Sequence, residues 1–538
     1  MKAQYLLVTC ALVAAMTVTA AAAVRTWSVH PQMAQATASN PGYYTYHYDN
    51  HRTGWNRAET TLTTASVSSG HFGLIRTFAA DSVVYAQPLY APNVLVNGVR
   101  RNLVIIATEN DSVYAYDADT GQLAWQKNFT NPAAGVTAVS PSSVNGCSQI
   151  MPTIGISSTP VIDPATGTLY VVDKFQVTGG SATTYHNQLI ALDLRSGASV
   201  LPPTEIAGSA RLSDGSSDVF ADQWQQNRLG LLLSAGNVYV GFGSSCDENA
   251  AVTHGWMFAY NAHTLQNVAI FNTTTTDAGS YLGALWSATY APAADLGGNL
   301  YLSTGNGAFD ANTGGTNYGE SVLRMTSNLK VAGYFSPSVE ATLSNADQDV
   351  GSTGNMIVPN GQTPQLLVAG VKSGTMYLLN RANLGGFDPS SDRVFQEVQI
   401  GNGYNSLYGG PSYYPGFVYW GAGGAPMNAY ALSMTPSPHL TLSSQTPNSF
   451  PGEGGEIAAV SSNGTQLGSA VIWATTRPVH GGTIQLFAYD ATNLRRELYA
   501  GNVGAWAASG DAFLAPTVAH GHVFVGGAGY GVAEFGIH

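Results

Sequence analysis

The stretch SVYAYDADTGQLAW, residues 112–125, decides the fold, because degraded copies of it recur along the whole chain. It consists of an alternating strand, an Asp-Ala-Asp-Thr-Gly turn and a second strand that ends in Trp125. Asx side chains in such a turn bond the nearby backbone, and glycine accepts a positive φ there. The later copies are QLIALDLRSG (188–197), WMFAYNAHTL (256–265), ESVLRMTSNL (320–329), TMYLLNRANL (375–384), MNAYALSMTP (427–436), IQLFAYDATNL (484–494) and VAEFGI (532–537).

Another apolar strand precedes every copy, which makes each repeat a unit of several strands. These earlier strands read NLVIIATE, GTLYVVD, GNVYVGFG, GNLYLSTG, QLLVAGV, GFVYWGA, SAVIWATT and HVFVGG. The eight copies are spaced by roughly fifty to seventy-five residues, at or above the range typical of propellers. Such strands bury their faces only when neighbouring sheets stack on them, and radial stacking leaves only short edges. The sequence therefore predicts an all-β, eight-bladed β-propeller of four-stranded antiparallel blades.

Both ends of the chain are expected in one blade. The last copy stops after its third strand, at His538, so an outer strand is missing. The segment GLIRTF at residues 73–78 fits that role. Residues 71–538 are thus predicted to form a single propeller domain. Residues 24–70 lack a clean period and are predicted to be an N-terminal arm.

Composition limits the classes of function. Only 10% of the residues are charged and the net charge is −12, with no basic run. Tight nucleic-acid binding is excluded on this basis, because phosphate neutralisation needs clustered Lys and Arg.

The first 23 residues have the shape of a secretory signal peptide. Lys2 precedes an apolar run from Tyr5 to about Val18, and small residues follow at 20–23. That run is short for a bilayer, so no membrane span is expected in the mature chain. Export to the periplasm or the extracellular space is predicted. Two cysteines, Cys147 and Cys246, remain in the mature chain, and the sequence leaves their pairing open.

DSVYAYDADTGQLAW (111–125) resembles the tryptophan-docking repeat of the pyrroloquinoline quinone (PQQ)-type propellers. That superfamily includes eight-bladed quinoprotein alcohol dehydrogenases and non-catalytic BamB-like assembly factors. The resemblance covers nearly the whole mature chain, although most later repeats lack the terminal Trp. It implies one of two functions. The first is a PQQ- and calcium-dependent dehydrogenase that oxidises an alcohol or sugar and passes electrons to an external acceptor. The second is a non-catalytic scaffold that binds a protein or glycan through Tyr-rich loops such as residues 408–420.

The resemblance implies positions for a metal and for the quinone. In GSSCDENAAVTHGWMFAYN (243–261), Glu248 falls near the metal-ligand position, and Asp247 is an alternative in the same register. In ALWSATYAPAADLGGNLYLSTGNGAFD (284–310), Trp286 takes the place of the stacking ring and Asn306 that of the amide metal ligand. Oxygen ligands of these types suit a hard divalent cation. Each residue is also compatible with an ordinary loop or hairpin turn.

Two further segments resemble the catalytic part of the family pattern. NADQDVGSTGNMIVP (345–359) implies Asp349 as catalytic base and metal ligand, with Asp347 as the second choice. With Asp349 as base, Gly351 stands where lanthanide-using relatives place an extra aspartate, and calcium is favoured. With Asp347 as base, Asp349 would be that extra ligand and the metal would be a lanthanide. In VKSGTMYLLNRANLGGF (371–387), Lys372 would donate to the quinone oxygens.

The chain also departs from the dehydrogenase pattern. It has no adjacent cysteine pair and no clear arginine to hold a PQQ carboxylate; Lys174 and Arg195 are weak candidates. Glu453 and Glu456 could form an acid pair but are expected to be solvated. The enzyme hypothesis predicts that the side chains of Glu248, Asn306 and Asp349 converge within reach of one cation.

Overall fold

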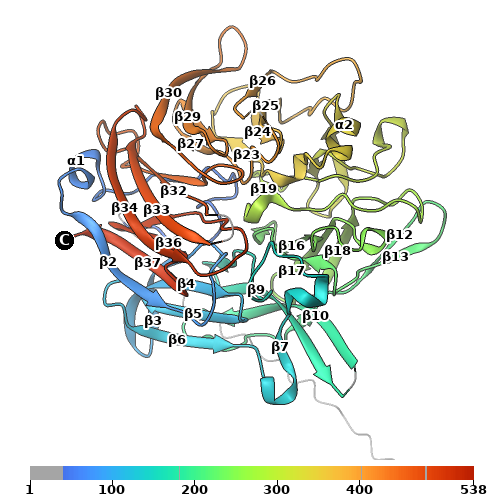
Figure 1. Cartoon of the computed structure of the whole chain (residues 1–538), viewed down its shortest axis with the longest axis horizontal. Helices are drawn as coiled ribbons and strands as arrows, with labels where there is room; N and C mark the ends of the chain where they lie inside the picture. The colour runs from blue at the N-terminus through green and yellow to red at the C-terminus, as the bar shows by residue number, and fades with distance from the viewer. Residues whose placement is uncertain (1–39, 181, 402, 479–480) are drawn as a thin grey trace, which may run out of the picture.

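The protein is an eight-bladed propeller arranged as a ring around a central channel (Figure 1). The structure is a computed structural model that describes residues 40–538 apart from 181, 402, 479 and 480. The predicted signal peptide, residues 1–23, and the first part of the predicted arm lie outside the described residues. Among the described residues, no helix has the length and apolar character needed to cross a membrane.

The eight blades are numbered here in the order in which their inner strands occur. Blade 1 contains β3 (Leu89–Val96), β4 (Val99–Thr108), β5 (Ser112–Asp117) and β6 (Leu123–Asn128). Blade 2 contains β7 (Val136–Ala138), β8 (Val161–Asp163), β9 (Thr168–Gly179), β10 (Ala182–Asp193) and β11 (Thr204–Glu205). Blade 3 contains β14 (Gln225–Gln226), β15 (Leu232–Ser234), β16 (Asn237–Ser244), β17 (Trp256–Asn261) and β18 (Asn267–Asn272). Blade 4 contains β19 (Ala293–Ala294), β20 (Leu300–Ser303), β21 (Val322–Met325) and β22 (Val331–Phe335).

The second half of the ring repeats this pattern and adds the two N-terminal strands. Blade 5 contains β23 (Met356–Val358), β24 (Leu366–Gly370), β25 (Thr375–Asn380) and β26 (Gln396–Gln399). Blade 6 contains β27 (Ser412–Tyr414), β28 (Phe417–Gly421), β29 (Pro426–Ser433) and β30 (His439–Ser449). Blade 7 contains β31 (Ala458–Ser461), β32 (Val471–Thr475), β33 (Gly482–Asp490), β34 (Glu497–Trp506) and the added β1 (Trp55–Asn56). Blade 8 contains β35 (Thr517–Ala519), β36 (His522–Gly526), β37 (Gly531–Ile537) and β2 (Phe72–Ala79).

Further regular elements of the described chain lie outside the eight blade sheets. A separate hairpin is formed by β12 (Ser209–Arg211) and β13 (Ser217–Val219). The two α-helices, α1 (Thr64–Val67) and α2 (Glu340–Asn345), are short. The all-β, eight-bladed architecture predicted from the repeats is therefore confirmed, with extra inner strands in blades 2, 3 and 7.

The predicted closure of the ring is also confirmed. β2 pairs antiparallel with β37, from Phe72 opposite Ile537 to Ala79 opposite Gly531. An N-terminal strand thereby completes the blade that the C-terminal strands begin. Closure of this kind leaves no long open sheet edge around the ring.

Trp125 shows how the repeat joins one blade to the next. Its indole N–H donates to the carbonyl of Leu194 in blade 2, with an N···O distance of 2.9 Å. A Cβ at Gly197 would lie 2.5 Å from the ring of Trp125, so the ring packs directly on the turn of the neighbouring copy. The glycine of one repeat therefore makes room for the tryptophan of the previous one.

Residues 43–56 of the predicted arm lie inside the channel and contact the innermost strand of all eight blades. The hydrogen-bonded pairs are Tyr43 with Tyr90 of β3, Tyr44 with Ile162 of β8, Asn50 with Leu233 of β15 and Ala294 of β19, His51 with Ile357 of β23, Thr53 with Tyr413 of β27, Gly54 with Val460 of β31, and Tyr48 with Val518 of β35. This segment is called the channel segment below. Most of these bonds use its backbone, which explains why its side chains show no period.

The channel segment separates two ends of the channel. Tyr46 stacks on His47 with ring centroids 4.8 Å apart, and both rings contact Tyr290. Arg52 is fully buried and donates to the carbonyls of Tyr46 and Pro292. At one end, here the site mouth, lie the loops after the second strand of each blade and the loops between blades. At the other end, the arm mouth, lie the turns between first and second strands and between third and fourth strands.

Candidate functional site

Most of the residues singled out in the sequence lie in loops of the site mouth. Asn306 lies three residues after β20, the second strand of blade 4, and Lys372 lies two residues after β24, the second strand of blade 5. Trp286 and Asp349 lie in the loops that lead into the first strands of those two blades. The repeat thus brings residues from separate blades to one end of the channel.

Asp349 is the centre of a polar cluster. Its Oδ1 accepts from the backbone N–H of Asn306 at 2.9 Å, and its Oδ2 accepts from the Ser352 hydroxyl at 3.1 Å. The ammonium of Lys372 lies 3.4 Å from Asp349 Oδ2 and 3.0 Å from Asp347 Oδ2. Burial lowers the pKa of Lys372, but the two carboxylates outweigh it and the net direction is upward. Lys372 therefore stays charged and links both candidate bases.

Asp247 is the second carboxylate of this cluster. Its side chain accepts a short hydrogen bond from the Ser244 hydroxyl. Burial raises the pKa of Asp247 to about 6; Asp349 and Asp347 add to the rise, and hydrogen bonds from Ser244 and Asn306 oppose it. The amide oxygen of Asn306 is buried and has no hydrogen-bond partner. Asp247, Asn306 and Asp349 therefore leave carboxylate charge and one free amide oxygen close together.

Glu248 has a different position from its neighbour. Glu248 is exposed, whereas Asp247 is partly buried. Cys246 and Asp247 both have positive φ, 53° and 54°, so the chain turns sharply before Glu248. Of the two carboxylates in the same register, the structure brings Asp247 to Asn306 and Asp349.

The donor set of the cluster suits a hard cation. In the described part of the chain, no three His, Cys, Asp or Glu side chains group around one point. A cation here would be held by Asp247, Asp349 and the unpartnered oxygen of Asn306, which are all oxygen ligands of the kind that calcium takes. A Cβ at Gly351 would lie 2.3 Å from the backbone nitrogen of Gly305, so position 351 has no room for an extra aspartate.

Trp286 packs closely against two glycines, Gly243 and Gly305. A Cβ at Gly305 would be 3.0 Å from its Cδ1, and a Cβ at Gly243 would be 3.1 Å from its Cε3. The ring is buried, and the Arg228 guanidinium carbon is 5.2 Å from its centroid. The ring is therefore held rigidly beside Asp349, with a cation over it.

Two buried arginines at this mouth were missed in the sequence. Arg228 and Arg477 lie on the Phe513 ring, each with its guanidinium carbon 4.7 Å from the centroid. Arg477 also lies 5.5 Å from the centroid of Tyr408. Burial lowers the pKa of both arginines. The position of Arg477, two residues after β32, matches that of Lys372 after β24 and could have identified it; no repeat signal marks Arg228.

The weaker candidates lie apart from the cluster or in structural roles. Lys174 is buried and donates to the carbonyls of Gln223 and Gln225. Arg195 pairs with Asp193 at 2.6 Å within a turn of the arm mouth.

Two other expectations are corrected by burial. Glu453 is exposed as expected, but Glu456 is only 1% exposed, and burial raises its pKa to about 7. The Tyr-rich segment 408–420 is largely a pair of strands in blade 6, in which Tyr413 and Tyr414 are buried. It does not form the exposed loop that the scaffold hypothesis expected.

Cys147 and Cys246 form a disulfide, with their Cα atoms 5.7 Å apart. The bond joins the loop between β7 and β8 of blade 2 to the loop that carries Asp247. The first of these loops also carries Gln149, whose side-chain oxygen accepts from Arg228 at 3.1 Å. The disulfide therefore fixes two loops of the site mouth to each other.

Comparisons with known proteins agree with this architecture. A family profile described as outer membrane protein assembly factor BamB matches residues 52–341, more than half of the chain. No curated protein sequence matches. Quinohemoprotein alcohol dehydrogenase from Comamonas testosteroni is 16% identical, with a TM-score of 0.60 over 94% of this chain and 81% of that one. Quinohemoprotein alcohol dehydrogenase ADHIIG from Pseudomonas putida HK5 is 14% identical, with a TM-score of 0.58 over 93% of this chain and 80% of that one. A europium-containing methanol dehydrogenase is 13% identical, with a TM-score of 0.55 over 94% of this chain and 99% of that one. At these identities the likeness shows the fold alone.

Proposed function

The chain belongs to the PQQ-like propeller family whose profile is described as outer membrane protein assembly factor BamB, and from this premise we propose that it is a PQQ- and calcium-dependent dehydrogenase. Its substrate would be an alcohol or a sugar, and the electrons taken from the substrate would pass to an external acceptor. The observation that carries the proposal is the meeting of Asp247, Asn306 and Asp349 beside Lys372 and Trp286 at one mouth of the channel.

Each residue has a role that follows from its position. Asp247, Asn306 and Asp349 would hold the calcium ion, and Trp286 would provide a flat surface for the quinone. Lys372 would donate hydrogen bonds to the quinone oxygens. When bound, PQQ supplies a two-electron acceptor, which the side chains of this protein lack.

Asp349 would take the proton of the substrate hydroxyl as general base. Asp347 stays the alternative base, since Lys372 contacts both carboxylates. Arg228 and Arg477 would neutralise carboxylate groups of the cofactor. Arg228 already lies over Trp286, so a stacked quinone requires this side chain to move aside.

Reconstitution tests the proposal. The purified protein is mixed with PQQ and Ca²⁺, and the absorbance of the bound quinone and dye-linked oxidation of alcohols and sugars are measured. We expect Asp349→Asn to abolish oxidation, Asp247→Asn to weaken cofactor loading by at least about tenfold, and the exposed Glu248→Gln to match the parent protein. Failure to take up PQQ would refute the proposal.

The position of Arg228 favours a non-catalytic propeller as the second candidate. If Arg228 stays on Trp286 when PQQ is present, the channel face of the ring is closed to a cofactor. The protein would then act by binding a protein or a glycan. Failure of PQQ uptake by the parent protein, together with uptake by Arg228→Ala, would show that Arg228 closes the ring and would support this candidate.

We also propose that the protein is exported to the periplasm or the extracellular space. Two features support this: the signal-like pattern of residues 1–23, and the Cys147–Cys246 disulfide, since such bonds persist in oxidising compartments. Fractionation of cells that express the full chain tests the proposal.

A further inference from the structure

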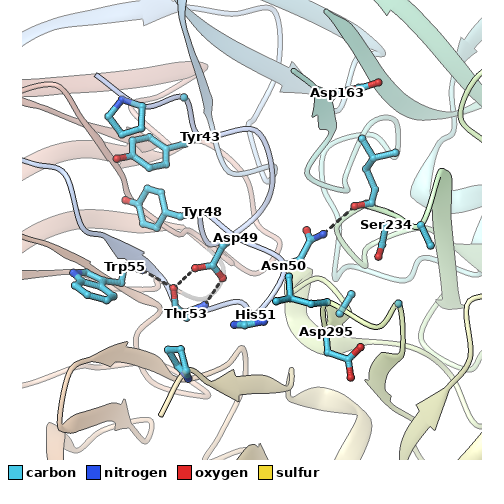
Figure 2. Close-up of a pocket in the computed structure, with 18 of the residues that line it drawn as sticks. Tyr43, Tyr48, Asp49, Asn50, His51, Thr53, Trp55, Asp163, Ser234 and Asp295 are labelled. Atoms are coloured by element: carbon cyan, nitrogen blue, oxygen red, sulfur yellow. Dashed lines mark hydrogen bonds between the residues drawn. The ribbon is translucent and has the colours of Figure 1, made fainter. Parts of the chain in front are cut away.

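A large bowl lies at the arm mouth, at the opposite end of the channel from the proposed quinone site (Figure 2). Its volume is about 1270 Å³. The channel segment contributes its floor, and the walls come mainly from the turns between the first and second strands of blades 2 to 5. Small residues at 234–236 and at 297–298 leave much of the backbone of these turns open to the bowl.

In the described part of the chain, buried side chains of the channel segment lie between the bowl and the site mouth. Tyr46, His47 and Arg52 are fully buried behind the floor, and Tyr290 donates from its hydroxyl to the carbonyl of Arg52 at 2.7 Å. A ligand in the bowl would therefore act separately from any cofactor beside Trp286.

Two chemically different walls face each other across this space. Figure 2 shows Tyr43, Tyr48 and Trp55 on one side and Asp163, Ser234 and Asp295 on the other. Tyr48 and Trp55 are both partly exposed. One wall thus offers aromatic surface, and the other offers hydrogen-bonding groups.

The polar groups are held in place by partners in the protein. Asp163 accepts from the N–H of Ala165 at 2.9 Å and from the hydroxyl of Thr166 at 2.8 Å. Asp49 accepts from the N–H of Thr53 at 3.1 Å and from its hydroxyl at 2.5 Å. Carboxylate oxygens have capacity for further hydrogen bonds, so each can also accept from a ligand.

The charge in the bowl is nearly balanced. Asp295 pairs with Arg381 at 3.1 Å. Buried Arg52 lies close to Asp49, and Arg57 adds a further positive charge at the wall. Burial lowers the pKa of His51, so its ring is neutral at pH 7. Neither a polyanion nor a polycation matches such a lining.

We propose that this bowl binds a short neutral oligosaccharide. A pyranose ring carries C–H groups on its faces and hydroxyls around its edge. The C–H faces suit Tyr48 and Trp55, and the hydroxyls suit the fixed carboxylates of Asp49 and Asp163. The bowl is larger than most small-molecule pockets, as an oligosaccharide requires.

Calorimetry and tryptophan fluorescence test this proposal with cellotriose, maltotriose and chitotriose as probes. We expect one of the three to bind the full chain and Ser234→Trp, which fills the bowl, to weaken that binding at least about tenfold. Ser69→Trp, at an exposed position near α1, is the matched control and keeps the parent affinity. Asp349→Asn keeps it too, which separates this site from the proposed quinone site. No binding at millimolar concentration would overturn the proposal. So would an unchanged affinity in Ser234→Trp, or tighter binding of spermidine or inorganic phosphate than of all three sugars.

Discussion

The two mouths of the channel are built from the same repeats but differ in the kinds of polar group that they bring together. At the arm mouth, the channel segment pairs with the inner strand of every blade, mostly through its backbone. At the site mouth, buried charged side chains meet, and the side-chain oxygen of Asn306 has no partner. One end of the channel is thus lined by regular backbone hydrogen bonding, although His47 Nε2 and Arg52 Nη2 of the channel segment also have no partner. The other end gathers buried charged side chains with shifted pKa values, which are typical of functional sites.

The largest expected loss of stability comes from a substitution in the channel segment. Arg52→Ala should lower the free energy of unfolding by about 4 kcal/mol, because it leaves buried carbonyls without donors and opens a cavity. Urea unfolding measures this loss. Arg57→Ala, at an exposed arginine directly after the channel segment, should change it by less than about 0.5 kcal/mol. Equal losses in the two variants would show that the channel segment does not stabilise the ring.

Removing the disulfide is the corresponding test at the site mouth. The double variant Cys147→Ser, Cys246→Ser should lose about 3 kcal/mol, because the bond closes a long loop, with a sequence separation of 99 residues. Reduction of the parent protein with dithiothreitol should give the same urea midpoint as the double variant. A midpoint unchanged by either treatment would mean that packing alone holds the two loops.

Asp247→Asn should have a smaller effect of opposite sign. Burial raises the pKa of Asp247 from 3.8 to about 6, so its contribution to stability is present below pH 3.8 and is lost as pH rises through 6. Without added metal, the variant should therefore be more stable than the parent by about 2 kcal/mol at pH 8 and equal to it at pH 3.5. Unfolding at both pH values measures this difference. Glu248→Gln, at the exposed neighbour, should show no such dependence. A destabilised Asp247→Asn at pH 8 would contradict the crowding of carboxylates described above.

The smallest expected loss of stability comes from a substitution at a glycine that packs against Trp286. Gly305→Ala places a Cβ 3.0 Å from both Asp349 Oδ1 and the Trp286 ring, and should cost about 1 kcal/mol. It should also shift the tryptophan fluorescence. Gly179→Ala is the matched control, since a Cβ there meets nothing within 4 Å. Identical spectra for both variants would show that Trp286 adjusts freely.

The fold could be predicted because the same strand–turn–strand pattern recurs in eight copies along the chain. The turn glycines, the alternating strands and the missing strand after VAEFGI each have a direct physical meaning, and together they specified the blades and the closure by β2. The channel segment could not be read in this way. Its bonds to the blades are mostly backbone bonds, and these leave no pattern in the side chains.

The candidate site was predicted in part for a similar reason. Asn306 and Lys372 occupy repeat-defined positions just after second strands, so their convergence on one mouth could be anticipated. The choice between Asp247 and Glu248 depends on two successive residues with positive φ, which the sequence does not reveal. Arg228 lies in a loop that matches none of the repeated motifs, so its position over Trp286 is visible only in the structure.

The channel segment also has a consequence for the time at which the protein can finish folding. Tyr48 is translated early, yet its hydroxyl accepts from the N–H of Val518, 470 residues later. The segment therefore waits for its last partners until nearly the whole chain has been made. Such a high contact order slows folding, and it makes the docking of these few residues a check on whether every blade is present. A chain that stops short of blade 8 would lack both the partner of Tyr48 and the partner of β2.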